Sequence, residues 1–531
     1  MYQCSGCGGP LKYDIATQNM KCEQCMSLTD PYSLQIKDGA EESYDATIFT
    51  CPHCGGEIIS MDDSLTEYCS FCGAHTVLQS RLCRIKKPNF IIPFTITKEE
   101  CKKIYLKHLG KSFFTPRAFK KAECIESFRG IYMPYWAYHV DQHNFAISKA
   151  HNSYRRGDYI ITDHFNLEYE VDAYYKGLSY DASSSFYDSI SEIIGPFDVK
   201  NMKEFHPAIL SGFYGDTMDI PSEVYCSDAF EYANTVTFEE LGKVPDFHEL
   251  TVEEPTDYDV RNYTLNTKLA SLDSTMYPVW FMSYRNKDRV AYATINGQTG
   301  KIATDMPIST SKYILMSLLI SVPIFLVLTL VATFTASGTL GIAALLGMIS
   351  LIIYSCEVNA IAKKDSFIED KGFMHKKGRY IRTPKKSKLS AKKKNSLFGS
   401  IIVIIFISIV TLSILFPFLT MLSQEIPLGI LTGLAAIIVS IINLCISSKK
   451  CKYLMQPFSP AIHILNIIAY GISIIISIAN PVSDIIYYIA VAITLLVVVC
   501  TNLSIINKQN MRTTRKLPQF NKTGGDNSVW D

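Results

Sequence analysis

Eight cysteines near the N-terminus have the spacing of metal ligands. They form four Cys-x-x-Cys pairs within the first 72 residues, and the last two pairs repeat the first two after a shift of 47 positions. Fourteen residues separate the inner cysteines of each set, and Gly8-Gly9 and Gly55-Gly56 recur at the same place in each copy. This internal repeat predicts two units of one kind. The candidate ligands are Cys4, Cys7, Cys22, Cys25, Cys51, Cys54, Cys69 and Cys72.

The spacing of the pairs has a chemical reason. Two residues between cysteines allow a tight turn that points both thiolates at one ion, and a glycine after the second cysteine allows the left-handed backbone that this turn requires. Two such turns give tetrahedral Zn²⁺ four sulfur ligands and leave no position for water, so both Zn²⁺ sites are expected to be structural. Segments this short cannot bury a useful core, and metal binding must supply roughly 10–16 kcal/mol of folding free energy. We therefore expect zinc ribbons at residues 1–36 and 47–80.

Other uses of these cysteines stay open. A rubredoxin-like iron site would use similar ligands, disulfides would need an oxidising compartment, and redox-active pairs usually occur singly on a βα unit. None of the four pairs precedes a convincing helical pattern, which favours zinc over redox chemistry. His53 and His75 lie beside ligands, but four sulfurs already complete each site, so neither is expected to bind. The remaining cysteines are expected to be buried thiols; they are Cys83, Cys101, Cys124, Cys226, Cys356, Cys445, Cys451 and Cys500.

The metal-binding units precede a strongly apolar second half. Of the 531 residues, 48% are apolar, and the mean hydropathy of +0.12 is high for a soluble chain of this length. Crossing a bilayer takes roughly 17–25 residues, and six runs of about this length predict an all-α membrane domain at residues 313–506. The runs are Tyr313–Phe334, Thr339–Ser355, Gly399–Leu422, Pro427–Ile446, Ala461–Ile478 and Ile485–Ile506.

Basic residues alternate between the connections of these six runs. Thirteen lie between runs two and three, in a predicted cytosolic loop at residues 356–398, three lie between runs four and five, and five lie in the tail at residues 507–531. The other three connections contain no Lys or Arg. The positive-inside rule then predicts a multi-pass protein of the plasma membrane with both termini in the cytoplasm, where thiols stay reduced for zinc. The stretch Lys376–Lys394 is a solvated loop, a contact with anionic membrane lipids, or both.

Residues 85–312 are expected to form a cytosolic α+β domain with more strand than helix. Lys98–Leu109 has the pattern of a short helix. Gly130–His139 and Met276–Tyr284 look like related strands, since each has a Trp two residues after a Pro. Each is expected to turn back into a second strand, and a tight hairpin turn with two glycines available for positive φ should follow the last of these. The second strands are Asn144–Lys149 and Arg289–Ile295, and the turn is Asn296–Lys301.

No residue pattern in this domain amounts to an active site. His139, His143 and His151 are candidates for a further metal cluster, but the pattern around them is that of strands and a turn, and Asp141 and His143 are better interpreted as turn residues. The sequence contains no Gly-x-Ser-x-Gly, no Walker loop and no His-Glu-x-x-His. We therefore expect no catalytic residues and a protein that is not an enzyme.

Together these features resemble a bacterial family of TFIIB-type double zinc-ribbon membrane proteins, sometimes labelled primosomal-helicase-like. The resemblance covers roughly residues 1–335 and rests on the paired ribbons, Ile91-Ile92-Pro93-Phe94, the segments Gly130–Trp136 and Tyr277–Trp280, and Asn296–Lys301 just before an apolar run. One relative is the zinc-ribbon component of a membrane complex encoded with a phage-shock protein A homologue, a stomatin-like (SPFH) protein and a TPM-domain protein. The resemblance implies protein partners of these kinds.

Charge separates the classes of function. Residues 1–312 carry a formal −12 and residues 313–531 a formal +13, and phosphate chains need a basic face, so nucleic acid is not expected as a partner. We expect a zinc-binding membrane scaffold or adaptor that docks cytosolic proteins in an envelope-stress response. One alternative is a transporter-like protein with a zinc-ribbon regulatory head, which is disfavoured because the runs hold no charge at mid-membrane depth and Asn443, His463 and Asn466 lie near helix ends. Another is a membrane-tethered nucleic-acid-binding zinc-ribbon protein.

Overall fold

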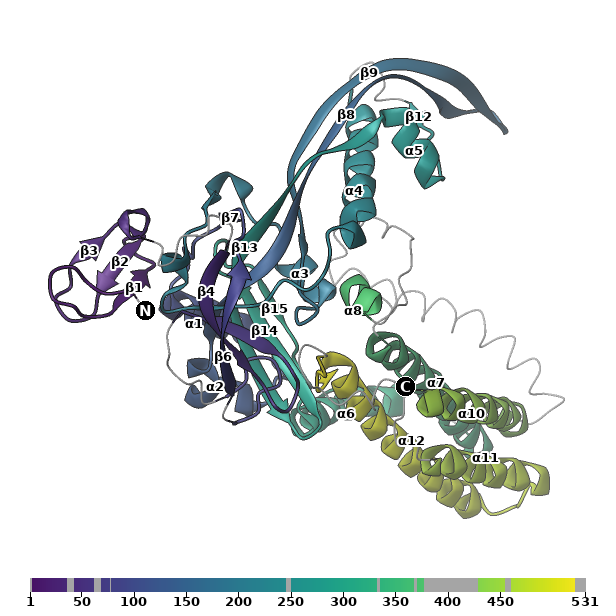
Figure 1. Cartoon of the computed structure of the whole chain (residues 1–531). Coiled ribbons are helices and arrows are strands. Elements are labelled where there is room, and N and C mark those ends of the chain that lie inside the picture. The colour runs from purple at the N-terminus through teal and green to yellow at the C-terminus, as the bar shows by residue number, and fades with distance from the viewer. Residues whose placement is uncertain are drawn as a thin grey trace.

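The computed structural model describes residues 2–35, 43–61, 68–76, 78–244, 250–331, 335–366, 370–376, 428–453 and 460–520. Three parts are arranged along the molecule (Figure 1). A small N-terminal unit holds the first four cysteines, a strand-rich part that we call the head holds the last four, and long helices project from one side of the head. The head comprises the strands and helices between residues 43 and 304.

The N-terminal unit is a three-stranded antiparallel sheet of β1 (Leu11–Asp14), β2 (Asn19–Cys22) and β3 (Leu28–Thr29). Alternation in β1 and β2 buries one face of the sheet, which is typical of a strand pair covered on one side. The unit stands at the outer end of the molecule in Figure 1. It touches the head through the Tyr13 N–H, which donates to the Ser211 carbonyl at 3.0 Å, and the Gln18 amide, which donates to the Phe94 carbonyl at 2.8 Å.

The strands around the last four cysteines belong to the large sheet of the head. β4 (Ser43–Thr50) pairs with β5 (Glu57–Ser60) and with β6 (Gln79–Lys86). The sheet has 13 strands, with β10-β7-β13-β8-β11-β5-β4-β6 as its main path, so the predicted limit between residues 80 and 85 falls inside β6. The other strands of this sheet are β7 (Phe90–Ile91), β8 (Arg129–Arg156), β9 (Tyr159–Asp181), β10 (Lys203–Glu204), β11 (Tyr214–Gly215), β12 (Thr251–Val252), β13 (Thr267–Asn286), β14 (Arg289–Asn296), β15 (Ile302–Thr304) and β16 (Arg515–Lys516).

Two long strands, β8 and β13, form the centre of the head. They pair antiparallel, with Trp136 opposite Ser274, and each also pairs with the strand that follows it, β9 or β14. The prediction of a second strand at Asn144–Lys149 was wrong, because these residues continue β8 without a turn. Asp141 and His143 therefore lie in a strand rather than in a turn. Burial of small side chains such as Ala146 and Ala150 keeps this part of β8 in the sheet, and small residues give a weak apolar signal.

The Asn296–Lys301 segment forms the predicted turn between β14 and β15. Only one of its two glycines uses positive φ, since Gly300 has φ +74°. Gly297 is needed for a different reason: a Cβ there would lie 2.5 Å from the Phe94 ring. The Asn296 side chain accepts backbone hydrogen bonds from Gln298 and Thr299, both at 2.9 Å, and so closes the turn.

Helices cover parts of the head. α1 (Lys98–Gly110) confirms the predicted helix, and Thr97 and Glu100 form a reciprocal capping box at its start. α4 (Glu223–Leu241) and α5 (Tyr258–Leu265) lie against the β8–β9 hairpin, into which they pack Phe238 and Leu265. The short helices are α2 (Ala122–Glu126), α3 (Asp188–Ile194), α8 (Lys371–Lys376) and the 3₁₀ turns Pro31–Ser33, Arg117–Lys120, Val199–Asn201 and Pro207–Leu210.

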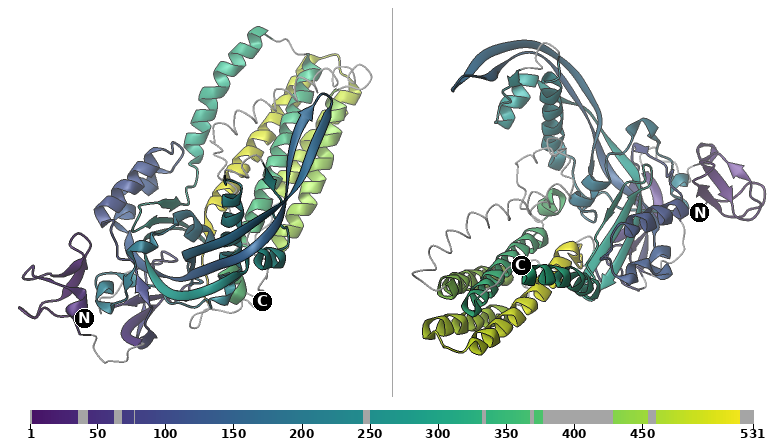
Figure 2. Two further views of the ribbon diagram at one scale, coloured as in Figure 1. Left: turned by 90° about the horizontal axis from the view of Figure 1, so that it is seen from above. Right: turned by 180° about the vertical axis from the view of Figure 1, so that it is seen from behind.

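Five helices in the described part of the chain are long and apolar enough to cross a membrane. They coincide with five of the six predicted runs, and the short run Thr339–Ser355 is part of a 30-residue helix. The run Gly399–Leu422 lies outside the described residues. The helices α7, α10, α11 and α12 pack side by side, whereas α6 stands apart from them (Figure 2). The five are α6 (Thr310–Val331), α7 (Ala336–Asp365), α10 (Leu428–Tyr453), α11 (Ala461–Ala479) and α12 (Asp484–Thr513).

A polar seam runs between the four packed helices. On α11 the buried side chains include His463, Asn466, Tyr470 and Ser473, at the spacing of one helix face. The Asn466 amide donates to the Thr501 hydroxyl of α12 at 3.0 Å and accepts from the Tyr470 hydroxyl at 2.9 Å. The sequence placed His463 and Asn466 near a helix end, and the structure adds that both are buried between helices. Such bonds hold helices together in a membrane.

Candidate metal centres

The four Cys-x-x-Cys pairs share one backbone turn. In each pair the N–H of the first cysteine bonds the carbonyl five residues on, and its own carbonyl accepts from the N–H four residues on. The residue four positions after the first cysteine has positive φ in every pair. It is a glycine three times, as predicted, with φ +73° at Gly8, +67° at Gly55 and +66° at Gly73, and Met26 takes the fourth position with φ +60°.

The first group brings Cys4, Cys7, Cys22 and Cys25 together. Cys4 Sγ lies 3.7 Å from Cys25 Sγ, and Cys7 Sγ lies 3.4 Å from Cys22 Sγ. The four sulfurs lie within 4.8 Å of one another, so the group could hold a metal ion. Two of the cysteines, Cys7 and Cys25, are exposed, whereas Cys4 and Cys22 are buried.

The second group brings Cys51, Cys54, Cys69 and Cys72 together with the same geometry. Cys51 Sγ lies 3.8 Å from Cys72 Sγ, and Cys54 Sγ lies 3.7 Å from Cys69 Sγ. All four cysteines of this group are buried. The two groups therefore share their ligand geometry and differ in their access to solvent.

Aromatic rings enclose the second group. The Phe71 ring meets Phe281 of β13 and Phe520 of the C-terminal tail edge-on, at centroid distances of 6.0 and 5.6 Å. The Tyr292 hydroxyl of β14 donates to the Phe71 carbonyl at 2.6 Å. Segments from the start, middle and end of the chain thus meet around this group. Phe520 could not be predicted to belong here, because nothing in the spacing of the tail distinguishes it.

Ser27 is a second residue that the sequence analysis did not identify. Its hydroxyl lies 3.2 Å from Cys4 Sγ and 3.1 Å from Cys25 Sγ. Hydrogen bonds from Ser27 and from the backbone of Gly6 and Cys7 lower the pKa of the Cys4 thiol to about 6, and Ser27 also lowers the pKa of Cys25. The thiolate forms of Cys4 and Cys25, which are the forms that bind metal, are thereby favoured, whereas the pKa of the Cys7 thiol is raised.

Histidines contribute to neither group. His53 and His75 fall outside both sets of ligands. Among the described residues, His139, His143 and His151 do not converge on a third metal-binding group; buried His139 contacts Asp273 at 3.0 Å instead. The expectation that the other cysteines are buried holds for Cys101 and Cys124 and is wrong for three that are exposed on the apolar helices, namely Cys356, Cys445 and Cys500.

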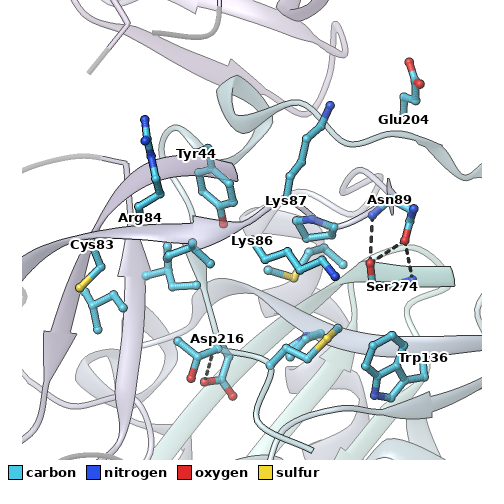
Figure 3. A pocket seen from close by; sticks show the side chains of 18 of the residues that line it. Tyr44, Cys83, Arg84, Lys86, Lys87, Asn89, Trp136, Glu204, Asp216 and Ser274 are labelled. Atoms are coloured by element: carbon cyan, nitrogen blue, oxygen red, sulfur yellow. Dashed lines mark hydrogen bonds between the residues drawn. The ribbon is translucent and has the colours of Figure 1, made fainter. Parts of the chain in front are cut away.

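A cavity of about 930 Å³ opens in the head between residues of β4, β5, β6, β8 and β13 (Figure 3). Its apolar lining includes Ile48, Ile59 and Met276, and its basic lining comes from Arg84 and its neighbours near the end of β6. In Figure 3 the labelled side chains of Lys86 and Lys87 lie across the cavity from Trp136 and Asp216.

Charged residues connect the head to the ends of two long helices. Arg289 of β14 contacts Asp365 at the end of α7 at 3.4 Å and donates to the Thr514 carbonyl after α12 at 2.9 Å. Arg515 contacts Asp305 at 3.4 Å, and its strand β16 pairs with β14. The end of α7 and the end of α12 therefore lie on the head side of the helical region.

Comparison with known proteins gives one relative of unassigned activity. The chain is 28% identical over 344 residues to the uncharacterized protein YdjG of Bacillus subtilis (strain 168), in a match that covers 64% of this chain and 98% of YdjG. About a third of this chain is thus outside the match. No family model matches the chain, and no solved structure matches it.

Proposed function

We propose that this protein is a zinc-stabilised membrane scaffold, not an enzyme, which docks an acidic, extended segment of a cytosolic protein along β6. The observation that carries the proposal is the position of β6 at the end of the main path of the large sheet. Among the described residues β6 pairs with β4, and a strand at the end of a sheet can accept an added strand. The neighbouring cavity and the basic side chains of β6 favour an added strand that carries acidic and apolar side chains.

The charges on β6 favour an acidic partner. Lys86 and Lys87 supply the positive charge at the end of β6, whereas Arg81 and Arg84 already contact Glu57 at 2.7 Å and Asp45 at 3.4 Å. Leu82 on the same strand is 76% exposed. Basic side chains on an edge strand repel a second copy of the same strand. An acidic segment would instead be attracted by these basic side chains, which would speed its association with β6.

Zinc is the metal that the two cysteine groups fit best. Tetrahedral Zn²⁺ with Zn–S bonds of about 2.3 Å separates its sulfurs by about 3.8 Å. The closest sulfur pairs in the two groups lie 3.4–3.8 Å apart. Cys4, Cys7, Cys22 and Cys25 would hold one ion and Cys51, Cys54, Cys69 and Cys72 the other. Four sulfurs leave no open coordination position, so both ions would have a structural role.

The connections between head and helices support a membrane topology with an even number of crossings. The chain leaves the head into α6 and returns to it after α12, where β16 pairs with β14. Two points on one side of a membrane are joined by an even number of crossings, and five apolar helices are described. The run 399–422 would supply the sixth. The Lys-rich connections then lie on the head side, and the positive-inside rule puts the head and both termini in the cytoplasm.

Site-specific photo-cross-linking in cells tests the docking proposal. A photoreactive amino acid at Leu82 should form adducts with a cytosolic protein, whereas one at Tyr263 on α5, which is 85% exposed, should not. The double substitution Lys86→Glu and Lys87→Glu should reduce the Leu82 adduct about tenfold, as expected for a charge-steered interface. Lys107→Glu on α1 is the matched control. Adducts that survive the double substitution would contradict the proposal.

The family resemblance supplies the first proteins to look for among the adducts. They are the phage-shock protein A homologue, the SPFH protein and the TPM-domain protein of the related complex. A partner of the proposed kind should present an acidic segment that is extended or disordered when free. Its binding should weaken as the salt concentration rises, because exposed charges are screened.

The polar seam of α11 supports a second candidate, transport of a solute between the helices. Polar groups inside a bundle serve either as contacts between helices or as a path. Flux measured in liposomes separates these roles. Solute flux that disappears in His463→Ala, without loss of the folded bundle, would favour transport over the scaffold.

Binding of nucleic acid is the weaker alternative for the zinc ribbons. Residues 1–312 carry a formal −12, and binding to phosphate chains depends on released counterions at basic residues. The detergent-extracted protein should show no shift of single- or double-stranded DNA at about 0.15 M salt. Salt-sensitive binding to the N-terminal unit would reverse this ranking.

A further inference from the structure

The β8–β9 hairpin extends well beyond the rest of the large sheet. β13 pairs with β8 only as far as Gln142, and β12 pairs with it at Ala150 and His151. Beyond His151 the hairpin has just its two strands within the described residues, up to the two-residue turn at Gly157 and Asp158. Two-stranded hairpins are marginal in water without a surface to pack on.

Helices α4 and α5 cover the inner face of the hairpin, but apolar residues on that face continue beyond them. Phe238 of α4 and Leu265 of α5 pack against Ala146, Leu167 and Tyr169. Phe165 follows on the same face, two residues from Leu167, and is 42% exposed. The apolar stripe therefore continues toward the tip without a described partner.

The tip, residues 152–165, exposes apolar side chains on both faces among polar and charged ones. Tyr159 and Ile160 point to opposite faces because they are adjacent in a strand, and each is 77% exposed. Arg155 and Arg156 lie opposite them in the register. Nearer the head the outer face is different, because it carries acidic residues such as Glu168 and Glu170, which are exposed. Exposed tyrosine and isoleucine beside arginine are typical of the interface between water and lipid.

The hairpin and the long apolar helices leave the head in the same direction. In Figure 1 both project to the right of the head, and in the right-hand view of Figure 2 both project to the left. In the view from above the hairpin and the helices also point the same way, although Figure 1 shows that they are separated (Figure 2). A bilayer around the helices extends sideways as a plane, so a hairpin that projects beside them in this direction would meet its surface.

We propose that the tip of the β8–β9 hairpin binds the surface of the bilayer that surrounds the helices. Tyr154, Tyr159 and Ile160 enter the interface between headgroups and acyl chains, and Arg155 and Arg156 contact lipid phosphates. The hairpin thereby holds the head at a fixed tilt over the membrane. The inference goes beyond the docking of a cytosolic protein and does not depend on it.

Tryptophan quenching in lipid nanodiscs tests the inference on the full chain. Tyr159→Trp is compared with Asp172→Trp, whose site is on the same hairpin near the head and whose side chain is 84% exposed. The discs contain phosphatidylcholine and phosphatidylglycerol with or without bromine on the acyl chains, and the emission of the parent protein is subtracted. We expect bromine to quench the added emission at 159 about threefold more than that at 172, as for an interfacial residue.

Trypsin cleavage after Arg155 and Arg156 gives a second readout. The parent should be protected at these bonds in nanodiscs and cut in detergent, and the double substitution Tyr159→Ser and Ile160→Ser should restore cutting in nanodiscs. Equal quenching at positions 159 and 172 would overturn the inference. So would a tip that is unquenched and cross-links to a second copy of the chain, because the apolar surface would then be a protein contact.

Discussion

The backbone N–H of Phe520 donates to the carbonyl oxygen of Cys54 at 2.6 Å. This bond connects the chain after the last apolar helix to the second cysteine group. The Phe520 ring also packs on Phe71, and a Cβ on Gly56 would lie 3.2 Å from that ring. The tail, the second cysteine group and the end of α12 are therefore parts of one packed junction, and metal at this group should stabilise the attachment of α12.

Phe520→Ala should speed the loss of metal from the second group. Phe520 is 5% exposed, and removing a buried phenylalanine costs roughly 3 kcal/mol. Part of that cost should appear as faster metal release to a chelator from Cys51, Cys54, Cys69 and Cys72, with release from the first group unchanged. Phe113→Ala, at a site that is 59% exposed, is the control. Identical release from Phe520→Ala and the parent would show that the tail does not support the site.

Metal release from the parent protein should have two phases. Cys7 and Cys25 are exposed, whereas all four cysteines of the second group are buried, and a chelator reaches exposed ligands first. Metal analysis should give two Zn²⁺ per chain, as the two groups of four sulfurs predict. Cys25→Ser should abolish only the fast phase and Cys72→Ser only the slow one, both followed with a colorimetric chelator. A single phase that disappears in either variant would mean that the groups are not independent.

Met26→Gly should stabilise the first group. Met26 has φ +60° at the position that glycine occupies in the other three turns, and a left-handed backbone costs a residue with a side chain roughly 1–2 kcal/mol. The substitution should therefore raise the affinity for Zn²⁺ about fivefold or more. Gly8→Ala should lower it by a similar factor, because a Cβ there meets nothing within 4 Å and the effect is backbone strain alone. Competition with a chelator of known affinity measures both.

The cysteine groups could be predicted from the sequence because each of their turns is formed by residues close together in the chain. Each turn is specified within six residues, so the pairs, their glycines and their grouping were all visible in the sequence. The merging of β4, β5 and β6 into the large sheet was not, because it depends on β11, which pairs β5 through Tyr214 and Gly215 far along the chain. Phe520 was missed for the same reason. Contacts between distant segments leave no periodic signal in either segment.

The long helices could be predicted from a local pattern, whereas the hairpin depends on contacts between distant segments. Apolar runs of membrane length predicted five of the described helices, since hydropathy alone determines them. The length of β8 was not predicted, because its buried positions after Gln142 are alanine and serine and its exposed positions include Phe145 and Ile147. The larger apolar side chains therefore occupy the exposed positions of the strand and the small ones the buried positions, which is the reverse of the usual pattern. What buries the small residues is the pair α4 and α5, whose position only the tertiary structure supplies.

Asp181→Asn should stabilise the head, and more so as the pH rises. Burial, followed by the nearby carboxylates of Asp188 and Asp370, raises the pKa of Asp181 well above its usual value. In the unfolded chain this carboxyl loses its proton near pH 4, whereas in the folded head it keeps the proton to a higher pH. Ionisation therefore penalises folding increasingly from pH 4 up to the folded pKa. Melting temperatures of the two proteins should converge at pH 4 and separate toward neutral pH. A constant difference would assign the effect to packing.

The packing of α7 on α11 gives the last prediction. A Cβ on Gly347 would lie 2.9 Å from Tyr470 Cζ and nearer still to the hydroxyl oxygen, so Gly347→Ala should force the two helices apart and cost about 1–3 kcal/mol, as overpacking does. Tyr470→Phe removes that hydroxyl together with its bond to Asn466. The double variant should then be less destabilised than the sum of the single ones, by about 1 kcal/mol. Gly471→Ala on α11, the helix of Tyr470, is the control, because its Cβ meets nothing within 4 Å.

Unfolding in mixed detergent micelles measures the stability of all four variants. Strict additivity would mean that Gly347 and Tyr470 are not in contact in the membrane, and the polar seam would lose its role in holding these helices together.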